Sequence, residues 1–189
     1  MASSSMVFGV YAPQPETSAP VLGRNRLRAW MPALAFTFLL AIESSPYLGA
    51  DHTSAPLQRV VEALFGYDVC VHWETIHHLI RKTGHFIGYG AFSLICFRAL
   101  WITLRGATSR MSCQLRAHGS ALLLTFVVAA ADEFHQSYLP NRTGQFSDVL
   151  LDTCGGVALC LVLFLMMQMY GWIKQAPSLR REWVAAAKV

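Results

Sequence analysis

Polar side chains in three stretches of the chain could support acid–base or binding chemistry. Within each stretch they recur at steps of one, three or four residues: Lys82, His85 and Tyr89; Asp132, Glu133 and Gln136; Asp148 and Asp152. Steps of three and four bring side chains to one face of a helix. We therefore expect each stretch to lie on a helix and to present its polar groups together.

These residue types suit two kinds of function. In an enzyme acting on a lipid headgroup, His85 would serve as acid, base or nucleophile, with Glu133 or Asp148 orienting it; these three are the catalytic candidates. In a binding protein, Lys82 and Arg142 would contact an anionic headgroup. The residues predicted to bind the ligand are Lys82, Tyr89, Asp132, Gln136, Arg142 and Asp152.

Other readings of the same residues stay open. The charged groups could form a purely structural ion-pair network between helices, or part of a proton or ion pathway. A metal-assisted enzyme could use His85, His135, Glu133 and Asp148, but no compact spacing such as H-E-x-x-H supports a metal site. The sequence therefore predicts neither a metal nor another cofactor.

The composition indicates that membrane helices position these groups. Hydrophobic residues make up 54% of the 189 residues and charged residues only 14%, whereas soluble domains carry about 25% charged residues. The apolar residues gather in four blocks: 29–42, 83–104, 117–131 and 149–172. Since about 20 residues span a hydrocarbon core, we predict an all-α, polytopic membrane helix bundle with about four transmembrane helices.

A short helix along the membrane interface is predicted between the first two blocks. Leu57, Val60, Val61, Leu64 and Phe65 recur at the spacing of one helix face. Before the first block, residues 1–28 read as a disordered cytoplasmic tail, and residues 173–189 as a basic cytoplasmic tail. Residues 29–172 form the predicted transmembrane domain. The five cysteines show no paired motif and read as buried apolar residues.

The distribution of Lys and Arg predicts the orientation. With four spans, the two chain ends and the loop between the second and third blocks share one face, which carries ten of the fifteen Lys and Arg residues. The opposite face carries four: Arg59, Arg81, Lys82 and Arg142. The positive-inside rule then places both termini in the cytoplasm. All three polar stretches, together with Glu43 and Ser44, converge on the outward side.

Two of these polar residues are costly where they lie. His85 and Asp152 each sit about one turn inside an apolar block, and a charge at the centre of a membrane helix costs about 2.5–3.5 kcal/mol. Pairing between a carboxylate and His85, Lys82 or Arg142 would offset part of that cost. We also expect close helix contacts at Gly84-x-x-x-Gly88 and at Gly155-Gly156.

The same motifs carry a resemblance to a family. Lys82-Thr-Gly-His85-Phe86-Ile-Gly-Tyr89 resembles the Lys-x-x-His-Phe-x-x-Tyr signature of the VanZ-like family of small bacterial membrane proteins. The stretches at 132–136, 140–142 and 147–149 resemble its later signatures in the same order. Gly88 and Asp152 depart from the residues common there, Glu and Asn.

The resemblance implies an integral protein of the bacterial inner membrane and envelope. The family's namesake is associated with low-level resistance to the glycopeptide teicoplanin. We therefore expect an outward polar pocket that binds a lipid-linked or glycopeptide ligand and modulates glycopeptide susceptibility; the alternative is an intramembrane enzyme acting on a lipid headgroup. The expected partners are membrane lipids, a lipid-linked envelope precursor or a glycopeptide, and no nucleic acid.

Overall fold

The computed structural model describes residues 19–46, 49–104, 109–139 and 144–186, and the regular structure in these ranges is helical, without strands. This confirms the predicted all-α class. The elements in chain order are α1 (Ala19–Glu43), α2 (Ala50–Phe65), the 3-10 helix η2 (Tyr67–His72), α3 (Trp73–Leu104), α4 (Arg110–Gln136) and α5 (Phe146–Ala186).

Three helical stretches in the described residues are long and apolar enough to cross a membrane: Tyr67–Leu104, Arg110–Gln136 and Phe146–Gly171. Helix α1 is not among them. Its apolar part, residues 29–42, lies between Arg28 and Glu43. This part is shorter than a full membrane span, which needs about 20 residues. The described residues thus support three of the four predicted spans by length and composition.

The outer helices extend further than the hydropathy pattern suggested. Residues 19–28, expected to belong to the disordered tail, are the first part of α1, and α5 continues past residue 172 to Ala186. Hydropathy marks the part of a helix that suits a membrane, whereas Ala, Leu, Lys, Arg and Glu sustain a helix outside it. Residues 1–18 and 187–189 lie outside the described residues.

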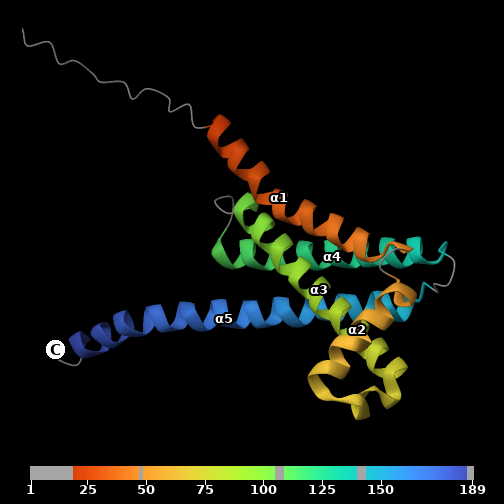
Figure 1. Cartoon of the computed structure of the whole chain (residues 1–189). Coiled ribbons are helices and arrows are strands. Elements are labelled where there is room, and N and C mark those ends of the chain that lie inside the picture. Colours follow the sequence, from red (N-terminus) through yellow and green to blue (C-terminus); the bar gives the residue numbers. More distant parts are fainter. Residues whose placement is uncertain (1–18, 47–48, 105–108, 140–143, 187–189) are drawn as a thin grey trace, which may run out of the picture.

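Helix α3 is the centre of the bundle and packs against α1, α4 and α5. Figure 1 shows that the end of α1, the start of α3, the end of α4 and the start of α5 lie at one side of the molecule. The start of α1 and the end of α5 lie at the other side (Figure 1). The predicted polar stretches therefore share one end of the bundle.

The core is built from α3 and small residues on its neighbours. Phe92 and Phe97 of α3 are buried in one cluster with Ala117, Ala121 and Ala129 of α4. Small side chains on α4 let the helices come close enough for the α3 aromatics to pack between them.

Glycines allow the close approach between α3 and α5, but they are only partly the glycines predicted from the sequence. A side chain at Gly155 would collide with the carbonyl oxygen of Phe86, and one at Gly90 would lie 3.0 Å from the carbonyl oxygen of Gly155. Gly84 has no neighbour within 4 Å, and Gly88 meets only a Leu40 methyl at 3.9 Å. The expected contact at Gly84-x-x-x-Gly88 is therefore wrong, because that face of α3 does not point at α5. The expectation for Gly155-Gly156 is confirmed, since a Cβ at Gly156 would also lie 3.2 Å from the Thr125 methyl of α4.

The predicted short helix before the second span is present as α2. It connects to the start of α3 through Trp73, whose Nε1 donates a hydrogen bond to Ser54 Oγ at 2.7 Å. Leu64 and Phe65 of its apolar face are 70% and 69% exposed. An apolar face left uncovered by protein suits a helix lying in a membrane interface.

Candidate functional site

Nine polar side chains from α1, α3, α4 and α5 gather at the end of the bundle described above. We call them the polar-end cluster: Glu43, Lys82, His85, Tyr89, Asp132, Glu133, Gln136, Asp148 and Asp152. The cluster so defined holds five carboxylates and one lysine. The cluster contains an ion pair, a histidine between two carboxylates and a glutamine that connects two helices, and a cavity adjoins it.

The ion pair joins the start of α5 to the first half of α3. Lys82 Nζ contacts Asp148 Oδ1, and the two side chains are 33% and 29% exposed. Ser147 Oγ also lies 3.5 Å from Asp148 Oδ1. The positive charge of Lys82 is therefore engaged within the protein.

His85 lies between carboxylates of two other helices. Its Nδ1 is 3.6 Å from Asp152 Oδ2 on α5, and its Nε2 is 3.7 Å from Glu43 Oε1 on α1. The His85 ring also stacks on Tyr89, with centroids 6.2 Å apart. These distances exceed those of a hydrogen bond, yet small side-chain rotations would bring either carboxylate into hydrogen-bond reach of the imidazole.

Two buried groups of the cluster lack hydrogen bonds within the described residues. Asp152 is 0% exposed and neither of its oxygens has a hydrogen-bond partner there; Tyr89 is 1% exposed and its hydroxyl has none either. Leaving a buried polar group without a partner costs about 1–3 kcal/mol. A buried polar group without a partner in the protein can be met by water, an ion or a ligand.

Gln136 and Glu133 fix the end of α4. Gln136 Nε2 donates to Asp132 Oδ2 at 3.0 Å and to Ser44 Oγ at 3.3 Å, which ties α4 to the end of α1. Glu133 Oε2 accepts a hydrogen bond from the backbone N–H of Gln145 at 2.9 Å, just before α5. Both side chains are buried, so these contacts position the helix ends.

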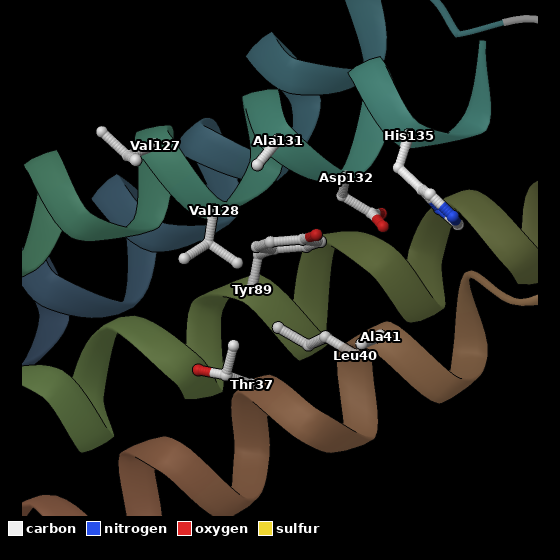
Figure 2. A pocket seen from close by; sticks show the side chains of 9 residues that line it. All are labelled: Thr37, Leu40, Ala41, Tyr89, Val127, Val128, Ala131, Asp132 and His135. Atoms are coloured by element: carbon white, nitrogen blue, oxygen red, sulfur yellow. The ribbon is translucent and has the colours of Figure 1, made fainter. Parts of the chain in front are cut away.

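A cavity of about 450 Å³ adjoins the cluster between α1, α3 and α4. Figure 2 shows the Tyr89 hydroxyl and the Asp132 carboxylate close together inside it, with His135 further along α4. The remaining walls are almost entirely apolar: Thr37, Leu40, Ala41, Val127, Val128 and Ala131. The cavity thus has one polar end and an otherwise almost entirely apolar lining.

The structure brings the predicted residues to one end of the bundle but not into one cavity. Tyr89 and Asp132 line the cavity. His85, Glu133 and Asp148 do not line it and instead contact other polar groups of the bundle end. Arg142 lies outside the described residues. Among the described residues, no group of three or more His, Cys, Asp or Glu is arranged to hold a metal ion.

Several residues at this end were absent from the predicted site. Glu43 and Ser44 make contacts to His85 and Gln136, and their only sequence signal was their place at the end of the first apolar block. His135 was considered only as a metal ligand. Thr37 and Leu40 line the cavity, but an apolar helix residue carries no sequence signal that distinguishes a cavity wall from a lipid-facing surface.

Comparison with known proteins indicates a family. The family model described as VanZ/LLP1 matches residues 31–167, which includes every residue of the polar-end cluster. No curated protein and no solved structure matches the chain significantly.

Proposed function

The chain belongs to the VanZ/LLP1 family, and on that premise we propose that it is a multi-pass protein of the bacterial inner membrane that binds a lipid or lipid-linked ligand. The polar-end cluster faces outward in this proposal, and both termini are cytoplasmic. The ligand is a membrane lipid or a lipid-linked envelope precursor. Through that binding the protein modulates susceptibility to glycopeptides.

The proposed topology has α1 as a fourth crossing. Support comes from the charge distribution, ten Lys and Arg against four, and from the start of α1 and the end of α5, which lie at the same side of the molecule (Figure 1). An odd number of crossings would separate those two ends. Reporter fusions after Arg110 and Lys174 should read cytoplasmic, and those after Gly66 and Asn141 should read external. An external signal after Arg110 would invert the arrangement.

The observation that carries the binding proposal is the cavity beside the cluster. An amphiphile has an apolar chain and a polar head, and the cavity offers Leu40, Val127 and Val128 to the first and Tyr89 and Asp132 to the second. Ligand sites are usually concave and mostly apolar, with a few polar groups that fix orientation. The volume of about 450 Å³ lies within the range of such sites.

Filling the cavity tests this proposal. Ala131 is exposed and lines the cavity, so the larger side chain of Ala131→Trp should occupy the cavity without disturbing the core. Leu123→Trp is the matched control, because Leu123 is 64% exposed on the same helix and is not a cavity residue. Each protein is purified in an uncharged detergent, and the lipids extracted from it are identified by mass spectrometry. Wild type and Leu123→Trp should carry the same specific lipid. The amount of that lipid should be at least fivefold lower in Ala131→Trp.

Equal lipid content in all three proteins would reject the cavity as the binding site. The same variants test the cellular consequence. Cells expressing Ala131→Trp should lose the change in teicoplanin susceptibility that wild-type expression causes, whereas Leu123→Trp should keep it. A wild-type chain without effect on susceptibility would remove that part of the proposal and leave lipid binding intact.

A second candidate function is an enzyme acting on a lipid headgroup, favoured by the placement of His85 between Asp152 and Glu43. In this candidate the buried Asp152 orients the ring through Nδ1, and the substrate takes the place of Glu43, which is 46% exposed, to exchange a proton with Nε2. Incubation with headgroup-labelled lipids should then release the label with wild type and not with His85→Gln. No release by wild type would reject this candidate.

A further inference from the structure

The cavity beside the polar-end cluster has an acidic polar end. Asp132 is the one carboxylate among its described lining residues, and that lining includes no lysine or arginine. Gln136 Nε2 donates a hydrogen bond to Asp132 Oδ2 at 3.0 Å, which holds the carboxylate in place beside the cavity. A lone carboxylate in apolar surroundings favours a positively charged partner, because charge is screened weakly there.

The other charged groups of the cluster have partners of their own. Glu43 and Asp152 flank His85 at 3.7 and 3.6 Å, close behind the cavity wall formed by Tyr89. Lys82 is engaged with Asp148 and does not line the cavity. Glu43, Asp152 and Lys82 thus face partners within the cluster, and Asp132 is the carboxylate that lines the cavity.

Tyr89 is a second and independent indication of a ligand. Its side chain is 1% exposed, its hydroxyl has no hydrogen-bond partner within the described residues, and it points toward Asp132 in the cavity (Figure 2). The hydroxyl oxygen can accept a hydrogen bond from an N–H donor of a ligand. Asp132 and Tyr89 together offer acceptors to a group with more than one N–H.

From this geometry we propose that the ligand is an amphiphile with an ammonium head. This proposal rests on the proposed function and names the class of its ligand. The ammonium donates hydrogen bonds to Asp132 Oδ1 and to the Tyr89 hydroxyl oxygen. The chain lies against Leu40, Val127 and Val128. This differs from the anionic headgroup expected at Lys82 and Arg142: Lys82 pairs with Asp148, and Arg142 lies outside the described residues.

Competition between matched amphiphiles tests the proposal. The full chain in an uncharged detergent is mixed with equal amounts of dodecylammonium, dodecanol and dodecyl phosphate, and bound ligands are counted by native mass spectrometry. Dodecylammonium should be retained about tenfold more than the other two, in keeping with a hydrogen bond between charged partners. Ethylammonium, which has the head without the chain, should show no retention.

Two substitutions assign the contact. Asp132→Asn should lower dodecylammonium retention about tenfold, and Tyr89→Phe, which removes only the hydroxyl, about threefold. Asp68→Asn is the control, since Asp68 is an exposed carboxylate of η2 outside the cavity. If Asp132→Asn fails to fold, the Tyr89→Phe result decides.

Preferred retention of dodecanol or dodecyl phosphate would overturn the ammonium proposal and leave amphiphile binding standing. Retention of dodecylammonium that neither substitution lowers would also overturn it. Absence of all three ligands from wild type, together with unchanged lipid content in Ala131→Trp, would overturn the proposed function itself.

Discussion

Two histidines, His85 and His118, lie toward opposite ends of the bundle and have opposite surroundings. His85 on α3 faces the carboxylates of Asp152 and Glu43 at 3.6 and 3.7 Å. His118 on α4 is 8% exposed and packs between aromatic rings, with its centroid 4.1 Å from that of Phe97 and 5.7 Å from that of Phe164. Neither ring nitrogen of His118 has a hydrogen-bond partner within the described residues.

The difference shows that residue type alone does not indicate a site in a membrane helix. The His118 ring serves as a flat aromatic surface, in contacts that phenylalanine could make equally well. His85 faces carboxylates on two other helices, so its nitrogens can form ion pairs there. The carboxylates at one end, and not the histidines as such, distinguish the candidate site.

The largest effect should come from removing the nitrogens of His85. His85→Phe leaves Asp152, which is 0% exposed, without its neighbouring imidazole and should lower the free energy of unfolding by about 3 kcal/mol. The measurement is unfolding by SDS in mixed micelles. The double variant His85→Phe, Asp152→Leu should recover most of the loss, because apolar groups replace both partners. A double variant as unstable as the single one would show that His85 and Asp152 are not coupled.

An intermediate effect is expected at the exposed side of the same cluster. Lys82→Met breaks the contact with Asp148, but both side chains are about one third exposed, so the loss should be about 1 kcal/mol or less. Lys82→Arg should keep wild-type stability in the same SDS titration. A loss for Lys82→Met as large as that for His85→Phe would place the main electrostatic coupling at Lys82 instead.

Sequence patterns predicted the helices better than their contacts. Long apolar runs predicted α3, α4 and α5, and the 3.6-residue spacing of Leu57 to Phe65 predicted α2, because these signals are local. They also predicted that the polar stretches share one end. Which partner each residue contacts depends on how neighbouring helices are rotated about their axes. The contacts of Lys82 with Asp148 and of His85 with Glu43 could therefore not be predicted from the sequence.

The smallest effect should come from His118. His118→Phe keeps the stack on Phe97 and removes two nitrogens that lack hydrogen bonds within the described residues, so stability should change by less than about 1 kcal/mol. Melting temperature in detergent, beside that of His85→Phe, checks this. A loss equal to that of His85→Phe would show that His118 has a polar partner of its own and would remove the contrast between the two ends.

The most direct test of amphiphile binding compares the two ends by photolabelling. A second hollow, of about 250 Å³, lies beside His118 between α4 and α5 and is apolar apart from that ring, so it lacks a carboxylate. A dodecylammonium with a diazirine in its chain should label Thr37, Leu40 or Ala41 of α1 and Val127 or Val128 of α4. Peptide mapping that finds the label instead on Leu115, Leu122 or Val157, beside His118, would contradict binding at the acidic end.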